Sequence, residues 1–436
     1  MAQDFHVFLA ALPVDDIPKP GPLPAGSLMP LSVNPFFVGR EEELRTLARQ
    51  LKAGETSIIG QVEIAGVSGL GGIGKTQLAS EFVHRYGRYF EGGVFWMSFA
   101  DLAAVPATVA ACGQSLDLHP SYASLPLDQQ IRLVEEDWKK PVPRLLVFDN
   151  CEEEQLLDRW RPKTGGARVL VTSRRSRWDR ALGAQTLSIT TLPRSASIEL
   201  LRRFRADVPA DEPELNWIAA ELGDLPLALH LAGSFLKCYA QVPYGQPASY
   251  LEALRRGGGK LRLSPTSHEE RVGRTFTLSV DRLAPENAID VFARRLLARA
   301  AWFAPGEAIP RDLLFKTLPP VRHGKALVDY FFLGVLRALH ETPEEPDAPF
   351  QAEDALARIT SLGLLESGDT GALVMHRLVA ELVRDSGGEE EARDAVEQSL
   401  WAEANRLAIL EARLGPEHPD TKTVRENLET LGAPSP

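Results

Sequence analysis

GLGGIGKT, residues 69–76, has the spacing G-x-x-x-x-G-K-T. An apolar stretch, QVEIAGVS (61–68), precedes it, and KTQLASEFVHRY (75–86) follows with apolar residues at helical spacing. Glycines let a backbone wrap closely around phosphate oxygens, and the N-terminal end of the following helix adds a partial positive charge. This context of strand, loop and helix predicts a phosphate loop that binds a nucleotide.

Two side chains of the loop would act on that nucleotide. The ammonium of Lys75 would reach the β- and γ-phosphates of ATP, and the hydroxyl of Thr76 would ligate Mg²⁺. A glycine-rich turn with a chance lysine is the alternative, but it leaves the flanking strand and helix patterns unexplained. The loop residues expected to contact the nucleotide are Gly69, Gly71, Gly72, Ile73, Gly74, Lys75, Thr76 and Gln77.

Short apolar runs bounded by turn residues recur after the loop. They are GGVFWMSFA (92–100), PRLLVFDN (143–150), ARVLVTSR (167–174) and AQTLSITTL (184–192). Such runs are expected of buried parallel strands, and a helical stretch at 127–139 separates two of them. Residues 36–192 are therefore predicted to form a three-layer α/β domain, a parallel sheet with helices on both faces.

Polar side chains at the ends of two runs are candidates for the chemistry. Asp149 follows four apolar residues and could hold Mg²⁺, although an aspartate at a strand end often caps a helix instead. The next residue is Asn150, whose amide cannot act as a general base, so fast hydrolysis is not expected. Arg174 could sense the γ-phosphate; the alternative is a surface salt bridge, and Arg175 and Arg177 compete for the role.

The composition is that of an ordinary globular protein, with 436 residues, 44% hydrophobic and 25% charged. A net charge of −11 argues against binding to nucleic acid or to an anionic membrane. Cys112, Cys151 and Cys238 are far apart and odd in number, which indicates small buried side chains rather than disulfides or metal ligands. No signal peptide or apolar stretch long enough to span a bilayer is visible, so a cytoplasmic protein with no membrane partner is expected.

Pattern changes divide the rest of the chain. Residues 1–35 are rich in proline and are expected to form an extended linker, which either follows an absent domain or packs on the body. The strand signal fades after the α/β domain, so 193–265 is predicted to be a helical domain. Residues 266–388 are mostly helical with a hairpin at LGLLES-GDTGALVMH, and 389–436 look like a short helical tail.

Six short stretches occur in one order along the chain. They are FVGREEEL (37–44), GLGGIGKT (69–76), LLVFDN (145–150), VTSR (171–174), GDLPLALHLAG (223–233) and VMHRLV (374–379). Each is weak alone, but the ordered set resembles the NB-ARC family of signal-transduction ATPases with numerous domains over about residues 36–385. The resemblance implies that the α/β and helical domains are followed by a winged-helix domain at 266–388.

The resemblance also implies roles for residues outside the glycine loop. Phe37, Val38 and Gly39 would lie near the adenine and ribose, with Arg40 beside them. Pro226 would pack against the adenine, and His376 would contact the β-phosphate of ADP and hold the winged-helix domain closed. Taken alone, each would more often be structural. The sequence departs from the family at Asn150 and at Arg377, where plant relatives commonly have an aspartate.

The tail carries a second resemblance. ANRLAILEARLGPEHPDTKTVRENLETL (404–431) resembles tetratricopeptide repeats of the kinesin-light-chain type. One repeat buries too little apolar surface to be stable alone. Either a longer array is truncated here, or the helices dock on the preceding domain.

The resemblances imply a nucleotide-dependent switch. ADP would hold it closed, and exchange for ATP would open it and allow self-association, with slow ATP hydrolysis as the reset. Such a switch would serve a bacterial sensing or defence pathway, with a protein ligand or effector as partner. The alternative is an ATP-dependent DNA-binding initiator or transcription regulator that uses the winged helix. Arg294, Arg295 and Arg299 are expected on a solvated helix face, so nucleic acid is not the expected partner.

Overall fold

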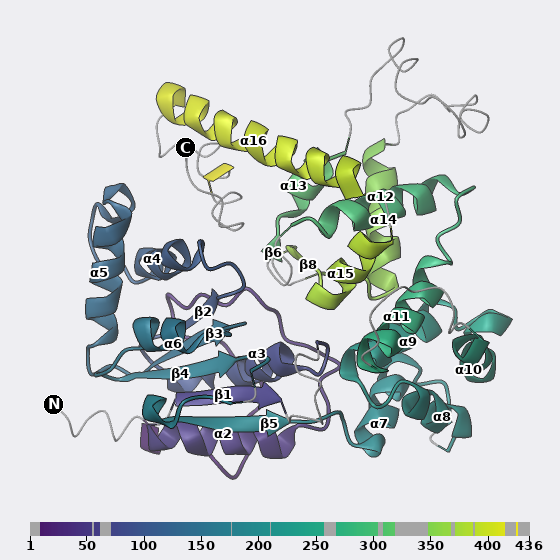
Figure 1. Ribbon diagram of the computed structural model, residues 1–436, viewed down its shortest axis with the longest axis horizontal. Coiled ribbons are helices and arrows are strands. Elements are labelled where there is room, and N and C mark those ends of the chain that lie inside the picture. The colour runs from purple at the N-terminus through teal and green to yellow at the C-terminus, as the bar shows by residue number, and fades with distance from the viewer. Residues whose placement is uncertain are drawn as a thin grey trace. The chain divides into compact units, whose positions relative to one another are not determined.

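The fold is described from a computed structural model. The structure describes residues 9–54, 56–61, 71–175, 177–209, 211–256, 267–303, 308–318, 348–367, 371–386, 389–414 and 424–425. The chain forms two compact units, Met1–Leu278 and Ser279–Pro436, and each is described by itself (Figure 1).

The first unit contains a five-stranded parallel sheet. Its strands are β1 (Thr56–Gln61), β2 (Val94–Ser98), β3 (Arg144–Asp149), β4 (Ala167–Thr172) and β5 (Ala184–Ile189), in the order β2-β3-β4-β1-β5. Four strands lie within the apolar runs that predicted them. The remaining strand, β1, begins earlier than its predicted run, at Thr56, because Ser57 is buried beside Ile58 and Ile59. Most of the stretch predicted for it, 62–68, lies outside the described residues.

Alternate side chains of each strand enter two different cores. On one face, Ile59 and Val147 pack with helices α2 (Glu41–Ala53) and α3 (Lys75–Tyr86). On the other face, Ile58 and Phe148 pack with three helices. These are α4 (Val105–Ser115), α5 (Leu127–Trp138) and α6 (Glu154–Trp160) (Figure 1). The predicted three-layer α/β domain is confirmed.

The proline-rich segment lies on this domain over its described residues 9–35. Leu9 and Leu12 are buried in the core beneath α2 and α3. Leu28 pairs with Phe95 as a parallel bridge, which extends the sheet beyond its edge strand β2. The segment also bonds to α3, where the amide of Gly21 donates to the carbonyl of His84 at 3.0 Å. Of the two alternatives for this segment, the described residues fit packing on the body.

Five further helices complete the first unit. They are α7 (Arg194–Phe204), α8 (Pro213–Glu221), α9 (Pro226–Cys238), α10 (Pro247–Arg256) and α11 (Ser267–Val280). Most of α11 belongs here although the sequence placed it in the third domain, because Arg274 donates a hydrogen bond to the carbonyl of Glu221 at 3.5 Å and Arg271 packs on Gly223.

The second unit combines helices with a small antiparallel sheet. Its elements are α12 (Ala288–Ala300), β6 (Ala308–Ile309), α13 (Arg311–Lys316), α14 (Ala348–Ser361), β7 (Glu366–Ser367), β8 (Leu373–Val374), α15 (Arg377–Asp385) and α16 (Glu389–Leu414). The sheet order is β6-β8-β7. Glu366 pairs with Val374, which confirms the predicted hairpin.

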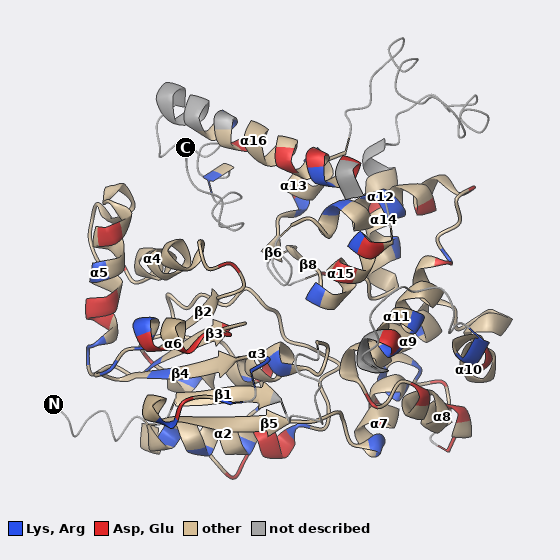
Figure 2. Ribbon diagram, viewed as in Figure 1, with Lys and Arg blue, Asp and Glu red and all other residues tan. Residues whose placement is uncertain are grey.

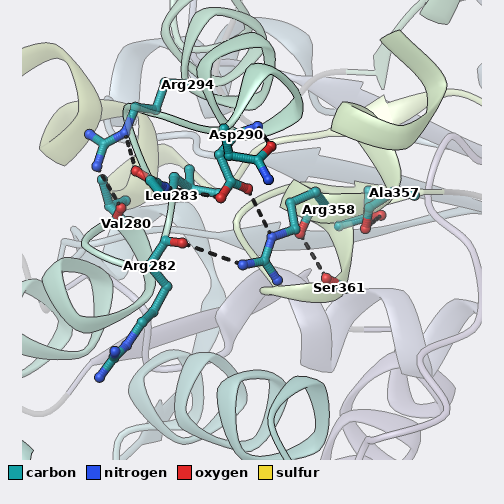
Figure 3. Close-up of polar contacts among 11 residues, drawn as sticks. Val280, Arg282, Leu283, Asp290, Arg294, Ala357, Arg358 and Ser361 are labelled. Carbon is teal, nitrogen blue, oxygen red and sulfur yellow. Dashed lines mark hydrogen bonds and ion pairs between the residues drawn. The ribbon is translucent and has the colours of Figure 1, made fainter. Parts of the chain in front are cut away.

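An ion pair joins α12 to α14. Asp290 accepts from the guanidinium of Arg358 at 3.1 Å, and its other oxygen accepts from the amide of Ala284 at 3.0 Å. The same guanidinium donates to the carbonyl of Arg282 at 3.4 Å (Figure 3). The connection between α11 and α12 is therefore fastened by side chains from two helices.

The prediction of a solvated arginine face on α12 is wrong for Arg299. This side chain is only 5% exposed, and burial lowers the pKa of its guanidinium. Arg294 is exposed, yet it donates to the carbonyls of Leu283 at 2.7 Å and Val280 at 2.9 Å (Figure 3). Apolar periodicity did not reveal these roles, because a long arginine stem can be buried in a protein interior.

The first tail helix docks within the second unit. Lys316 of α13 forms an ion pair with the buried Glu403 of α16 at 2.6 Å. The predicted second tail helix lies outside the described residues except for Val424 and Arg425. Acidic and basic side chains are interspersed along α5 and along the described part of α16 (Figure 2).

Two of the three cysteines are buried as expected, whereas Cys238 is half-buried. Cys112 and Cys151 are fully buried, and burial raises the pKa of each thiol to about 12. Among the described helices, none is both long enough and apolar enough to cross a membrane.

Candidate functional site

The described part of the phosphate loop runs from Gly71 to Gly74; Gly69 lies outside the described residues. Gly72 and Gly74 have φ angles of 79° and 94°, a left-handed backbone that favours glycine. Ile73 between them is buried. The helix α3 begins at Lys75 without a side-chain cap and without an acid in its first turn. The loop therefore leads into a helix start that favours an anion.

Arg40 is bonded to the backbone of this loop. Its side chain is 4% exposed, and its guanidinium donates to the carbonyl of Ile73 at 3.3 Å and to that of Thr190 after β5. It also pairs with Glu43 at 2.8 Å. The resemblance placed Arg40 beside the residues expected near the adenine and ribose, and these contacts join its guanidinium to the backbone of the loop.

Hydroxyl and carboxylate groups meet at the ends of β3 and β4. Asp149 Oδ1 accepts from the hydroxyl of Thr76 at 2.9 Å and from the hydroxyl of Thr172. The amide of Asn150 donates to Thr172 Oγ1 at 3.0 Å. Burial raises the pKa of Asp149, although hydrogen bonds from both threonines and the charge of Lys75 oppose the rise. A positive ligand would stabilise this buried carboxylate.

The pair formed by Thr76 and Asp149 fits Mg²⁺. This ion commonly takes one or two carboxylates and fills its shell with water and phosphate oxygens. Among the described residues, no group of three or more histidines, cysteines, aspartates or glutamates could hold a metal by itself. A Mg²⁺ ion held by Thr76 and Asp149 could complete its shell with water and with phosphate oxygens.

Lys75 carries its charge in a poorly solvated place. Desolvation lowers the pKa of its ammonium to about 8, with Arg174 lowering it further and Glu152 and Asp149 raising it. Two carboxylates and one guanidinium thus act together on the pKa of Lys75. An ammonium that is costly to desolvate gains from an added anion, as phosphate would be.

Of the three candidate arginines, Arg174 is the one whose charge acts on Lys75. Arg175 instead pairs with Glu154 at 2.9 Å and lies over the ring of Trp178. Arg177 is exposed. Of the three, Arg174 is therefore the best candidate for a guanidinium that acts on the phosphate loop.

Glu152 also belongs to the site, although the sequence analysis did not name it. Its carboxylate accepts from Ser173 Oγ at 2.8 Å and from the amide of Arg174 at 2.9 and 3.1 Å. Asn150, with a φ of 57°, turns the chain, and the amide of Cys151 then bonds to the carbonyl of Thr172 at 3.0 Å. This turn brings Glu152 to the end of β4. The available signal was an acid three residues beyond Asp149.

The GDLPLAL stretch meets the loop directly. Gly223 and Asp224 have φ angles of 60° and 57°, a tight turn that leads into α9. The amide of Leu227 donates to the carbonyl of Gly72 at 3.2 Å. The ring of Pro226 lies so close to Gly74 that a Cβ there would be 3.7 Å from its Cγ. Pro226, predicted at the adenine, thus lies at the phosphate loop.

The FVGR segment packs between the sheet and α7. Val38 is buried, and Gly39 has a φ of 66°. A Cβ on Gly39 would lie 2.3 Å from the Cβ of Ala196, so a larger residue would collide with α7. The side-chain oxygen of Gln77 in α3 accepts from the side-chain amide nitrogen (Nδ2) of Asn34 at 3.0 Å. This bond links the helix that follows the loop to the segment before FVGR.

His376 caps a helix of the second unit. Its Nδ1 accepts from the amide of Leu378 at 3.1 Å at the start of α15. Since Nδ1 accepts, the proton of the neutral ring is on Nε2, which is then a donor. Arg377, the departure from the family pattern, pairs with Glu381 on its own helix at 3.1 Å.

Comparison with known proteins gives sequence relatives that are regulators. No protein-family model matches the chain. It is 28% identical over 290 residues to the regulatory protein AfsR of Streptomyces griseus, covering 65% of this chain and 28% of that protein. It is 25% identical over 262 residues to AfsR of Streptomyces coelicolor, covering 58% of this chain and 26% of that protein. The chain spans about a quarter of the length of these relatives.

Among solved structures, one similar chain is a signal transduction ATPase with numerous domains (STAND) that has a tetratricopeptide repeat sensor, from Pyrococcus horikoshii. The identity is 16%, the TM-score is 0.49, and the match covers 93% of this chain and 49% of that one. A likeness at this level assigns no role to any residue of the site. The sequence relatives are thus named regulatory proteins, and the described part of this chain's own loop has the backbone and helix start of a phosphate-binding loop.

Proposed function

We propose that this chain is a signal-transduction switch that binds ADP or ATP, in the manner of NB-ARC proteins. One observation carries the proposal: the amide of Leu227, in the first turn of α9, is bonded to the carbonyl of Gly72 in the phosphate loop. A nucleotide held by the loop would therefore also act on the helical part of the unit.

In this proposal the loop grips the phosphates. Lys75 neutralises charge on the β- and γ-phosphates, and Thr76 and Asp149 hold Mg²⁺, which would neutralise further charge when bound. Arg174 lies where its charge already acts on Lys75, so it would respond to the presence of a γ-phosphate. Hydrolysis is slow and resets the switch rather than driving continuous turnover.

The closed form would involve the second unit through His376. The cap to Leu378 leaves Nε2 as the protonated nitrogen, which suits a contact to the β-phosphate of ADP. We infer that β6, β7 and β8 with their helices form the winged-helix domain of the family. Moving the population from about 1:99 to about 99:1 takes roughly 5.5 kcal/mol of differential binding.

Opening with ATP would allow self-association, and the signal would come from a protein ligand or pass to an effector protein. The sequence relatives are named regulatory proteins, which supports a role in bacterial sensing or defence. The α16 helix, docked on α13 through Lys316 and Glu403, would be the first helix of a tetratricopeptide-like tail.

The first test is to purify the chain without added nucleotide, denature it, and identify what is released. We expect stoichiometric ADP. A protein that is purified empty and turns ATP over rapidly would overturn the switch, and stimulation by DNA would then be the next measurement.

Three variants separate the roles of His376. His376→Ala removes both the cap and the ring, whereas His376→Asn keeps a capping side chain and removes Nε2. His119→Ala is the matched control, because Nδ1 of this exposed histidine also accepts from an amide two residues on, that of Ser121 at 3.1 Å. We expect both His376 variants to release ADP about tenfold faster, a change of roughly 1.4 kcal/mol. Unchanged release from both would remove His376 from the nucleotide site.

A further inference from the structure

ATP hydrolysis requires an acceptor for the proton of the attacking water, and the residue expected to supply it cannot do so. Asn150 follows Asp149, and its amide is no base. Asp149 itself is 6% exposed and is bonded to Thr76 and Thr172, the arrangement expected of a metal ligand. A general base at this site would therefore have to be another carboxylate.

The neighbouring acids differ sharply in what they contact. Glu153 is exposed. Glu154 pairs with Arg175 at 2.9 Å and accepts from the amide of Asp179 at 2.9 Å. Glu152 alone of these three both contacts the end of β4 and acts on the charge of Lys75.

The carboxylate of Glu152 is held in a fixed orientation. Ser173 Oγ donates to Oε2, and the amide of Arg174 donates to both oxygens. Both donors come from the segment that follows β4, which lies beside β1 and beside β3. A carboxylate retains further lone pairs after accepting these bonds, so Glu152 can still accept a hydrogen bond from a water.

We propose that Glu152 is the general base for ATP hydrolysis in this chain. It would fill the role that Asn150 cannot, because Asn150 has an amide in place of a carboxylate. The inference rests on the proposed nucleotide site. The water oxygen forms a bond to the γ-phosphorus as one of its protons passes to the carboxylate of Glu152. The bond from the γ-phosphorus to the bridging oxygen breaks, and ADP leaves with that electron pair. Glu152 then returns the proton to solvent.

The variant Glu152→Gln separates this role from a structural one. Its amide oxygen can still accept from Arg174, and its NH₂ can bond to Ser173, but it cannot take a proton from water. Glu153→Gln is the matched control, because it makes the same change in the adjacent exposed residue. Equilibrium titration with ATP and with ADP, single-turnover hydrolysis and the nucleotide retained after purification are measured on the full chain.

We expect Glu152→Gln to bind both nucleotides as the wild type does and to hydrolyse ATP about 100-fold more slowly or worse. The purified variant should retain ATP where the wild type retains ADP, and Glu153→Gln should match the wild type throughout. Unchanged hydrolysis in Glu152→Gln would overturn the assignment. Loss of nucleotide binding together with hydrolysis would also overturn it, because Glu152 would then be structural.

The wild type distinguishes failure of this inference from failure of the switch. A wild-type chain that binds ATP and ADP but never hydrolyses ATP contradicts a general base and leaves the switch intact. A wild-type chain that binds neither nucleotide contradicts the proposed function itself.

Discussion

Leu227 donates its amide hydrogen to the carbonyl oxygen of Gly72 at 3.2 Å, so the first turn of α9 is bonded to the phosphate loop. The contact is close on both sides. A Cβ on Gly72 would lie 3.0 Å from the Cβ of Leu227 and 3.1 Å from its Cδ2. A movement of the loop backbone at Gly72 would therefore displace the start of α9. A nucleotide switch needs coupling of this kind.

The variant Gly72→Ala tests this contact. We expect a loss of about 1–3 kcal/mol in the free energy of unfolding, from overpacking against Leu227. The left-handed φ of 79° adds about 1–2 kcal/mol of strain. ADP affinity, measured by titration, should fall with it, because the loop must shift. Gly183→Ala is the control, since Gly183 has a φ of 61° and nothing lies within 4 Å of an added Cβ. Equal effects from the two variants would mean that the contact with Leu227 is unimportant.

Arg40 is expected to stabilise the loop rather than to contact the ribose. Arg40→Met keeps the aliphatic stem but leaves the carbonyls of Ile73 and Thr190 without their charged donor. The free energy of unfolding should fall by about 3 kcal/mol, since bonds to charged groups contribute roughly 1.5–3 kcal/mol each. Urea unfolding measures this loss. Arg132→Met, which changes a side chain 74% exposed, should cost less than about 0.5 kcal/mol.

ADP affinity gives the second measurement on Arg40→Met. We expect it to fall about tenfold, roughly 1.4 kcal/mol, because the loop backbone is less well fixed. A variant with normal stability and greatly weakened ADP binding would instead favour a direct contact between Arg40 and the nucleotide.

The sequence could predict the α/β domain because each of its signals is local. The four central residues of RLLVFD are apolar, and all six residues are buried in β3. The helix expected at 75–86 is α3 with the same bounds. The hairpin that pairs Glu366 with Val374 could also be predicted, because turn residues lie between two apolar runs.

The rest could not be predicted because it depends on contacts between distant residues. Leu12 and Leu28 follow no regular period in a proline-rich stretch, yet one is buried under α2 and α3 and the other extends the sheet. Glu152 lies in a turn of charged residues, and only the pairing of Cys151 with Thr172 brings it to Ser173. Motif spacing located Asp149 but gave no reason to look three residues further.

The proline-rich segment should contribute to stability like any core element. Leu12 is fully buried, so Leu12→Ala should cost about 2–5 kcal/mol in the free energy of unfolding, from lost burial and the cavity left behind. Leu102→Ala, in a side chain 49% exposed, should cost far less. Urea unfolding followed by tryptophan fluorescence compares the two. Matching small losses would mean that residues 9–35 behave as a detached linker.

Asp224 provides a prediction about pH. Burial alone would raise its pKa, but hydrogen bonds from Arg194 and Ser197 and the charges of Arg194 and Arg271 lower it below the ordinary value of 3.8. The Arg194 guanidinium binds both carboxylate oxygens, at 2.7 and 2.8 Å. A lowered pKa in the folded state means that the carboxylate stabilises the fold at neutral pH and loses this effect as the pH falls through the folded pKa.

The variant Asp224→Asn should therefore be less stable than the wild type at pH 7, and the difference should shrink below about pH 4. Asparagine tolerates the left-handed φ of 57°, so the turn itself is preserved. We expect a loss of about 1 kcal/mol or less, because Arg194 is 39% exposed and solvent screens the pair. Asp128→Asn, in an exposed pair with Arg132, is the control and should show almost no difference at either pH. The difference in the free energy of unfolding between Asp224→Asn and the wild type could instead stay constant from pH 7 to the acid range. The effect would then come from the shape of the turn rather than from the charge.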